Sequence, residues 1–411
     1  MNIAQNTSLR NCTSCQLCAA ICPRSAISIS LDADGFYRPS IKEEHCVNCG
    51  ICTKICYKFD KTILEYTSDK LASTLLYGAY SKDVDILKNT TSGGIADIIA
   101  HYLMQNGYKC IGVVYDSEKD IALHKVANTE DDIIRFRGSK YIQSFTLEAF
   151  KEVVSNCKTT RYAVFGTPCH IYALDKYFRL HGVREHHILV DLYCHGCPSM
   201  LIWNKYINSV KSHIGAVRID NANFRSKIRG WGNFYVEVNV EGTQPFYSDY
   251  KHNEFIDLFF SDQLLNEACN DCLLRSTLAY TDIRLGDFWG KQYIMNDKGV
   301  SAVSLVTDRA KSLFESIANK VYYKEEHYDD FLPWQSWGLM HKPNRKLREQ
   351  VFSQLRDPNT PLQQSLDTIY SKYSIMKRLI CYGKCLAHAL PLRFEKCIRW
   401  IYYKFFSLIQ H

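Results

Sequence analysis

Eight cysteines near the amino terminus form two copies of one pattern. Both copies read C-x2-C-x2-C-x3-C, the first being Cys12, Cys15, Cys18 and Cys22 and the second Cys46, Cys49, Cys52 and Cys56. Three thiolates at this spacing wrap one face of a cubane iron–sulfur cluster, and the fourth reaches the neighbouring cluster. We therefore predict two 4Fe-4S clusters, with the ligand sets Cys12, Cys15, Cys18, Cys56 and Cys46, Cys49, Cys52, Cys22.

Zinc and disulfide bonds explain this pattern less well. Structural zinc usually takes two separated C-x2-C pairs and does not need eight cysteines in this register. Disulfides require an oxidising compartment, and residues 1–10 are polar, without the apolar core of a signal peptide. The 18 cysteines of the chain therefore indicate a reducing cytoplasm, in which thiols serve metals and redox chemistry.

Composition limits the other functions. A chain of 411 residues is long enough for two or three domains. Residues 371–411 hold eight basic residues and one acid, so the other 370 residues carry equal numbers of basic and acidic side chains. A neutral body argues against nucleic-acid binding. No window offers the ~18 uninterrupted apolar residues of a membrane span.

The sequence changes character after the cysteine-rich segment. Residues 1–67 are predicted to form a two-cluster ferredoxin-like domain, with a short strand at 26–30. Residues 77–325 alternate apolar β-branched runs with helical patterns, which predicts an α/β domain. Its buried strands are expected at 111–115, 162–165, 188–192, 283–285 and 302–306, and 236–240 is expected to have one wet face.

Further chemistry is expected where strands end and helices begin. Ser92, Gly93 and Gly94 precede a helix predicted over 95–105, and backbone N–H groups at such a turn suit a phosphate, although the same residues also cap ordinary helices. Three loops after or before strands carry four cysteines, namely Cys169, Cys194, Cys269 and Cys272. Open α/β sheets place ligands at strand ends, so these thiols are either a third metal site or small apolar residues of the core.

Two basic segments, 135–141 and 224–231, combine Arg and Lys with Gly and aromatic residues. Such segments can pair with the phosphates of a flavin dinucleotide. Solvated basic loops have the same composition, and taken alone the segments favour that reading.

The motifs, taken in order, resemble the family of coenzyme F420 hydrogenase/dehydrogenase beta subunits, preceded by a two-cluster ferredoxin domain. The matching segments are Thr91-Ser92-Gly93-Gly94, Arg137-Gly138-Ser139-Lys140-Tyr141, Gly166-Thr167-Pro168-Cys169, Asp191-Leu192-Tyr193-Cys194-His195-Gly196, Phe224-Arg225-Ser226-Lys227, Cys269-x2-Cys272 and Gly286-Asp287-Phe288-Trp289-Gly290. The resemblance implies an FAD-binding α/β domain that carries its own 4Fe-4S cluster. It implies that Cys169, Cys194, Cys269 and Cys272 hold that cluster, and that Ser92, Gly93, Gly94, Ser139, Lys140, Arg225 and Lys227 lie at the FAD site.

One departure from the family is Cys197, which stands where relatives commonly have an aliphatic residue. It leaves open whether Cys194 or Cys197 is the ligand.

Two functions are consistent with these features. The first is an FAD- and 4Fe-4S-dependent oxidoreductase that exchanges electrons with a ferredoxin-like or other redox protein and with an unassigned small-molecule substrate. The second is a non-catalytic electron-transfer subunit that feeds a separate partner enzyme. A flavin suits the point where the clusters pass electrons on in either case, because it handles both one-electron and two-electron steps.

Residues 326–411 carry none of the family motifs and are predicted to be a helical carboxy-terminal extension. A helix is expected at 345–356, and 331–337 is expected to be a loop that packs aromatic side chains on the body. The last forty residues mix basic side chains with Ile398, Ile401, Phe405 and Leu408 at helical spacing. That pattern fits peripheral contact with an anionic membrane surface, and it fits equally a helical hairpin packed on the body or on a partner.

Overall fold

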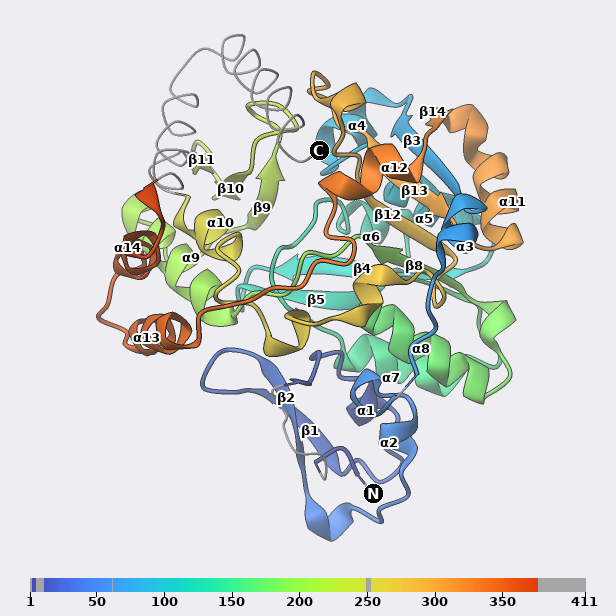
Figure 1. The fold of residues 1–411 in the computed structure, drawn as a ribbon, viewed down its shortest axis with the longest axis horizontal. Helices are drawn as coiled ribbons and strands as arrows, with labels where there is room; N and C mark the ends of the chain where they lie inside the picture. The colour runs from blue at the N-terminus through green and yellow to red at the C-terminus, as the bar shows by residue number, and fades with distance from the viewer. Residues whose placement is uncertain (1, 5–10, 61, 249–252, 376–411) are drawn as a thin grey trace.

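A computed structural model describes residues 2–4, 11–60, 62–248 and 253–375. The predicted membrane-surface helix with Ile398, Ile401, Phe405 and Leu408 lies outside these described residues. The described chain forms an amino-terminal segment, a large central sheet with helices on both faces, and a second, smaller sheet with its own helices (Figure 1).

The central sheet has nine strands in the order β14-β3-β13-β12-β8-β7-β4-β5-β6. In chain order these are β3 Leu75–Ser81, β4 Lys109–Asp116, β5 Ile121–Val126, β6 Ser144–Phe145, β7 Tyr162–Phe165, β8 Ile188–Leu192, β12 Ile283–Asp287, β13 Ser301–Leu305 and β14 Val321–Glu325. The pairs β4/β7, β7/β8, β8/β12 and β5/β6 are parallel, and the other neighbours are antiparallel. The sheet is therefore mixed, with a parallel centre in which β7, β8 and β12 lie side by side.

Alternating side chains of the central strands build a core on each face of the sheet. Ile188 and Val190 of β8 join the core formed with the helices α5 and α11, whereas Leu189 points to the core formed with α7 and α8. Both faces are covered because the strands are apolar on both sides, as expected for a parallel sheet. The helices of this domain are α3 Ser68–Ala72, α4 Val84–Asn89, α5 Ile95–Gln105, α6 Glu130–Ile134, α7 Leu147–Asn156, α8 Pro168–Leu180, α11 Asp308–Ile317 and α12 Tyr328–Phe331.

The second sheet is antiparallel, in the order β11-β10-β9, and lies beside the central sheet (Figure 1). Its strands are β9 Asn221–Ser226, β10 Tyr235–Asn239 and β11 Phe246–Tyr247, and the helices around it are α9 Met200–Ile214, α10 Glu254–Phe259, α13 Arg345–Arg356 and α14 Leu362–Ser371. Trp203, Phe224 and Phe255 fill the core between them. The helices α13 and α14 pack on α9, so the described part of the carboxy-terminal extension belongs to this core.

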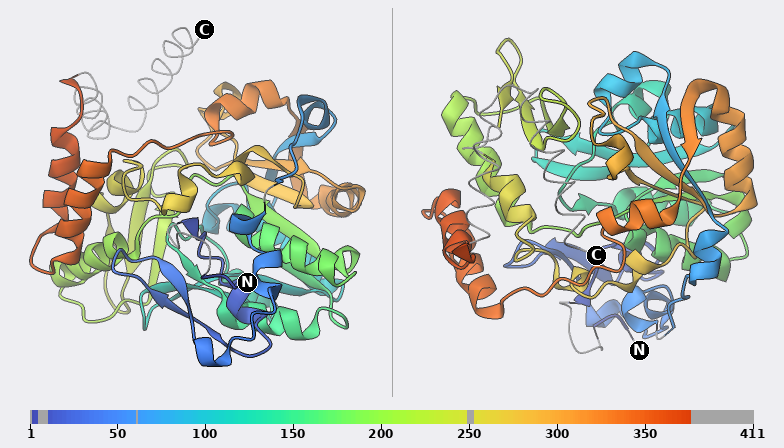
Figure 2. Two further views of the ribbon diagram at one scale, coloured as in Figure 1. Left: turned by 60° about the horizontal axis from the view of Figure 1, so that its bottom comes forward. Right: turned by 45° about the horizontal axis from the view of Figure 1, so that its top comes forward.

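The amino-terminal segment contains the hairpin β1 Ile27–Leu31 with β2 Tyr37–Ile41 and two short helices, α1 Leu17–Ala20 and α2 Ile51–Lys54. It lies against α7 and α8, on the face of the central sheet opposite α11 (Figures 1 and 2). Leu17 and Ile55 are each no more than 1% exposed and share a core with Phe150 of α7 and Leu174 of α8. This packing fixes the cysteine loops next to the sheet.

Most expected elements are present. The predicted strands correspond to β1, β4, β7, β8, β10, β12 and β13, and the predicted helices to α5 and α13. Glu237 and Asn239 of β10 are partly exposed while Val236 and Val238 are buried, which confirms the expected wet face.

The expectation of a loop over 331–337 was partly wrong. Residues Leu332–Trp334 form a 3-10 helix that continues α12, because a proline is tolerated in the first turn. The aromatic packing itself is present. Phe331 is fully buried, with its ring 4.8 Å from that of Phe288 and 4.9 Å from that of Tyr193.

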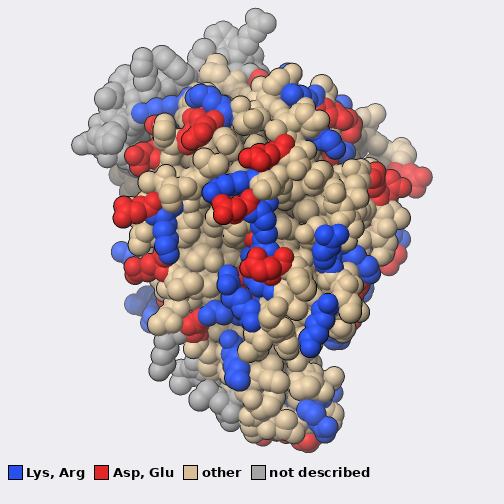
Figure 3. Space-filling view, turned by 90° about the vertical axis from the view of Figure 1, so that its right-hand side faces the viewer, with Lys and Arg blue, Asp and Glu red and all other residues tan. Residues whose placement is uncertain are grey.

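Positive and negative side chains are mixed on the face shown in Figure 3. This distribution agrees with the balanced charge of residues 1–370. Among the described residues, no helix is both long enough and apolar enough to cross a bilayer.

Candidate redox centres and flavin site

The two cysteine repeats fold in the same way. The third and fifth positions of each repeat have a left-handed backbone, with φ values of 62° at Ser14 and Gln16, 52° at Asn48 and 75° at Gly50. These residues turn the chain so that successive cysteines face one side, and a short helix, α1 or α2, follows each turn. The matched geometry explains how one spacing produces two equivalent loops.

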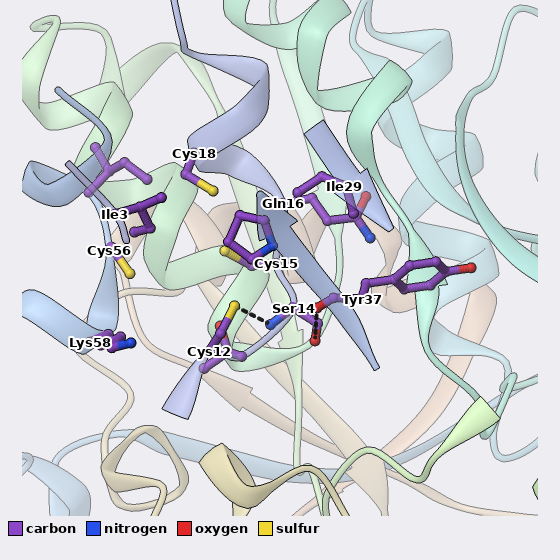
Figure 4. Close-up of a pocket in the computed structure, with 13 residues that line it drawn as sticks. Ile3, Cys12, Ser14, Cys15, Gln16, Cys18, Ile29, Tyr37, Cys56 and Lys58 are labelled. Carbon is purple, nitrogen blue, oxygen red and sulfur yellow. Dashed lines mark hydrogen bonds between the residues drawn. The ribbon is translucent and has the colours of Figure 1, made fainter. Parts of the chain in front are cut away.

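The structure gathers the cysteines in the two sets that the spacing predicts. Cys12, Cys15, Cys18 and Cys56 line one hollow, and Cys22, Cys46, Cys49 and Cys52 line another. Figure 4 shows the four sulfur atoms of the first set turned toward the same space. Each hollow can therefore present four thiolates to one metal centre, with the fourth ligand exchanged between the repeats.

N–H groups point at several of these sulfur atoms. The Ser14 N–H lies 3.4 Å from Cys12 Sγ, and the Ala26 N–H lies 3.3 Å from Cys22 Sγ. Burial raises the pKa of Cys15 to about 11 and that of Cys56 to about 12, and the neighbouring thiols act in the same direction. Four thiolates so close together, most of them at least partly buried, need a cation to balance their charge, which suits an iron–sulfur cluster.

A third group of thiols lies at the carboxyl ends of the parallel strands. Cys169 follows β7 at the start of α8, Cys194 follows β8, and Cys269 and Cys272 come from the segment that precedes β12. Burial raises the pKa of Cys269 to about 12, and the nearby thiols of Cys194 and Cys272 act in the same direction. The four predicted thiols are thus brought together from three separate segments of the chain.

Cys197 joins this group as a fifth thiol. Burial raises its pKa well above the usual value, and Cys269, Cys194 and Cys169 are close enough to add to the effect. The turn between Cys194 and Cys197 is tight at Gly196, where an added Cβ would lie 2.7 Å from a methyl carbon of Leu265 and 3.5 Å from Cys269 Cβ. Both Cys194 and Cys197 therefore lie near Cys269, and which of the two would be the ligand stays open.

The third group of thiols lies next to the first set of the amino-terminal segment. Asn266, three residues before Cys269, donates from Nδ2 to the Cys12 carbonyl at 3.0 Å and to Ser14 Oγ at 3.2 Å. Tyr57, which follows Cys56, accepts the Leu273 N–H at 2.9 Å on its hydroxyl. Burial raises the pKa of Cys169, and a hydrogen bond with Thr167 opposes this rise. The nearby thiol of Cys15 adds to the rise. Contacts on both sides hold the two groups together.

The residues predicted to bind FAD also lie near the carboxyl ends of the central strands, on a different side from the third group of thiols. The Ser139 N–H donates to Thr91 Oγ1 at 2.7 Å, and Lys227 Nζ donates to the Ser92 carbonyl at 2.7 Å. Gly93 is packed so closely that an added Cβ would lie 2.2 Å from the Ala79 carbonyl oxygen. Gly94 has a φ of 81° and caps α5. The segments around residues 92, 139 and 227 therefore form one cradle.

Two partly buried lysines give this cradle a positive character. The hydrogen bonds described for the Lys140 ammonium go to the carbonyls of Arg135, Phe136 and Arg137, and those for Lys227 also go to carbonyls. Burial lowers the pKa of Lys140 to about 7 and that of Lys227 to about 8. The carbonyls that bind Lys140 follow the carboxyl end of α6, whereas the Ser92 carbonyl that binds Lys227 lies just before α5. Positive charge near the amino terminus of α5 favours an anionic group such as a phosphate.

Arg225 lies deeper and has acidic and aromatic partners that the sequence did not predict. Its guanidinium donates to Tyr141 Oη at 2.9 Å and to Asp287 Oδ2 at 3.0 Å, and lies 3.8 Å from the centre of the Phe234 ring. Asp287 also accepts from Trp231 Nε1 at 3.0 Å. Tyr141 and Asp287 belong to motifs that the sequence singled out, but only the fold shows that they position Arg225.

These features define an iron–sulfur redox protein in which an amino-terminal cysteine-rich domain lies on a mixed α/β domain. The comparisons identify the family. Residues 76–151 match the amino-terminal model of the coenzyme F420 hydrogenase/dehydrogenase beta subunit, residues 159–330 match the carboxy-terminal model, and residues 11–58 match a 4Fe-4S dicluster domain. The chain belongs to the family of coenzyme F420 hydrogenase/dehydrogenase beta subunits, and the resemblance inferred from the motifs is confirmed.

The chain is similar to several methanogen proteins. It is 27% identical over 173 residues to a subunit of the F(420)H(2) dehydrogenase of Methanosarcina mazei, covering 39% of this chain and 47% of that protein. It is 23% identical over 240 residues to the beta subunit of the coenzyme F420 hydrogenase of Methanococcus voltae, covering 56% of this chain and 80% of that protein. The chain thus spans about half the length of the dehydrogenase protein.

Among solved structures, the F420-reducing [NiFe] hydrogenase complex of Methanosarcina barkeri contains a similar chain. The two share 17% identity with a TM-score of 0.45, over 76% of this chain and 92% of that chain.

Proposed function

We propose that this protein is an iron–sulfur flavoprotein oxidoreductase that passes electrons between a ferredoxin-like donor and an organic substrate. One observation carries the proposal. The thiols Cys169, Cys194, Cys269 and Cys272, from three segments of the α/β domain, gather beside the amino-terminal set that contains Cys15. A protein that only bound metal for stability would not need a third group of thiols between its cysteine domain and a phosphate-binding cradle.

The chain's own residues have distinct tasks in this proposal. The two amino-terminal sets and the third group would each supply four thiolates to a 4Fe-4S cluster. Ser92, Gly93, Gly94, Ser139, Lys140, Arg225 and Lys227 would bind FAD. When bound, the clusters carry single electrons, and FAD exchanges one or two. Arg225 is held in one position by Tyr141 and by an ion pair with Asp287, so it would orient the wall of the cradle without reorganisation.

The first experiment measures iron, sulfide and flavin in anaerobically purified protein. We expect about twelve iron atoms and one FAD in the wild type and about eight iron atoms in Cys169→Ala. Cys110→Ala is the matched control, because Cys110 is also buried but donates to the Ala100 carbonyl, away from the three groups. The control should keep about twelve iron atoms.

The outcomes separate the two candidate functions. About eight iron atoms and no flavin in every variant would refute the proposal and leave a two-cluster electron-transfer subunit that feeds a partner enzyme. Three clusters and FAD without turnover, when a chemical reductant and a range of acceptors are supplied, would also favour the electron-transfer subunit. Turnover by the isolated chain would establish an enzyme.

A further inference from the structure

Another group of possible metal ligands, made of two histidines and one aspartate, lies outside the three cysteine groups and the flavin cradle. His195 follows β8, Asp262 follows α10, and His341 precedes α13. One ligand atom of each residue lies within 4.8 Å of those of the other two. His195 Nε2 is 2.6 Å from Asp262 Oδ1, and His341 Nδ1 is 3.3 Å from Asp262 Oδ2.

The proton positions of His341 are fixed by its backbone partner. His341 Nε2 lies 2.8 Å from the carbonyl oxygen of His195. A carbonyl oxygen only accepts, so Nε2 must carry hydrogen and donate. In the neutral ring, Nδ1 is then a bare lone pair.

That lone pair has no suitable partner in the metal-free arrangement. The His341 side chain is 1% exposed, and its Nδ1 atom is buried without a well-formed hydrogen bond. It faces a carboxylate oxygen of Asp262, which is also an acceptor. Two acceptors facing each other in a buried place are unfavourable unless a proton or a metal cation lies between them.

The second imidazole is oriented in a compatible way. His195 Nδ1 lies 3.3 Å from the hydroxyl of Ser336, so it can donate there and leave Nε2 free to bind a metal. Metal-binding histidines usually donate their other nitrogen to a carbonyl, carboxylate or similar acceptor, which fixes the ring. Both imidazoles of this cluster have such an outer partner.

We propose that His195, Asp262 and His341 bind one divalent transition-metal ion, with zinc as the best match. Two imidazole nitrogens and one carboxylate are the ligands of many open zinc sites, and the fourth position is left for water or a ligand. The side chains of His195 and Asp262 are 22% and 35% exposed, so the metal would be reached from solvent. Donor atoms around tetrahedral zinc lie ~3.3 Å apart, so the His195–Asp262 pair, at 2.6 Å, has to open by about 0.7 Å.

Elemental analysis and zinc X-ray absorption test this site directly. The full chain, with its iron loaded anaerobically, is dialysed against buffered zinc and then desalted. One zinc per chain is expected to remain, with nitrogen and oxygen neighbours at about 2.0–2.1 Å. Zinc with sulfur neighbours at about 2.3 Å would instead occupy cysteines and would overturn the proposal. So would the absence of retained zinc.

Matched variants complete the test. His341→Gln and Asp262→Asn should each lose the retained zinc while keeping wild-type iron content, circular dichroism and visible spectrum. His186→Ala, at an exposed histidine outside the cluster, should keep the zinc. If the folded His341→Gln and Asp262→Asn proteins retained zinc bound to nitrogen and oxygen, the assignment of these ligands would be refuted. The zinc readout does not depend on flavin content, so it stands apart from the test of the proposed function.

Discussion

Asp282 is a buried carboxylate that ties together the strands carrying the redox residues. It is fully buried, and each of its oxygens accepts two hydrogen bonds. Oδ2 accepts from Arg184 Nη2 at 3.0 Å and from the Leu189 N–H of β8 at 2.8 Å. Oδ1 accepts from Thr307 Oγ1 at 3.0 Å and from Arg309 Nε at 2.8 Å. We therefore predict that Asp282→Asn is strongly destabilising although it preserves the shape of the side chain.

The expected loss follows from the donors around Asp282. An asparagine amide has one accepting oxygen, so either orientation places its NH2 group against two donors, one of them a guanidinium. Leaving a buried charge without its partner costs about 3–5 kcal/mol. Arg184 retains Asp175 at 2.6 Å, which favours the lower end of that range. For a cooperative chain of 411 residues, a loss of this size lowers Tm by about 3–6 °C.

The assay is thermal unfolding followed by circular dichroism under anaerobic conditions, with equal iron content in each sample. Asp308→Asn is the control, because Asp308 pairs with Lys311 at 3.0 Å but its side chain is 98% exposed. The control should shift Tm by about 1 °C or less, since surface ion pairs contribute little. Equal shifts for Asp282→Asn and Asp308→Asn would refute the reasoning that this buried network holds β8 and β12 together.

Two further predictions concern the flavin cradle and the aromatic core. Burial lowers the pKa of Lys140 to about 7, so its ammonium is charged below that pH and neutral above it. Because the charged form favours the phosphates of FAD, FAD affinity should fall up to about tenfold per pH unit above pH 7. Flavin fluorescence measures this affinity. Lys140→Met should flatten this dependence, and an unchanged slope would exclude Lys140 as its cause. Phe331→Ala should cost about 3–5 kcal/mol, because the ring is fully buried against Phe288 and Tyr193. Val84→Ala, at a side chain that is 76% exposed, should leave Tm nearly unchanged, and a similar shift in both variants would contradict the assignment of Phe331 to the core.

Sequence patterns predicted the elements that depend on local spacing. The cysteine repeats, the apolar runs of β7 and β8 and the glycine-capped helix α5 each carry a signal within a few residues, and the structure contains them. The α/β class of the central domain was also predicted correctly, whereas the antiparallel pairing of strands in its sheet was not predicted.

Elements that depend on distant partners were not predicted. The strand β3 contains Gly78, and a glycine in a sequence usually indicates the end of a strand. An added Cβ at this position would lie 2.4 Å from the Tyr293 hydroxyl, so the glycine makes room for the packed tyrosine ring. The edge strand β14 lacks an apolar alternation, since only its first residue is buried. Both strands exist because neighbours far away in the sequence pair with them.

The same limit applies to the sites. Spacing predicted which three cysteines of each repeat share a hollow, because that part of the pattern is local, and the fourth comes from the other repeat. The partners of Arg225 and the cluster of His195, Asp262 and His341 combine residues from separate loops. Single histidines and aspartates give no signal in a sequence, so only the fold brings these residues to notice.

Of the eight amino-terminal cysteines, Cys49 is the exposed one, and the other seven are partly or fully buried. Val47, two residues before Cys49, is 61% exposed, whereas Cys18 of the neighbouring set is buried and the third group is partly buried at the carboxyl ends of β7 and β8. Dioxygen or another small oxidant would therefore meet the outermost set first. We expect the cluster held by this set to be lost first on exposure to air, while the more enclosed centres survive.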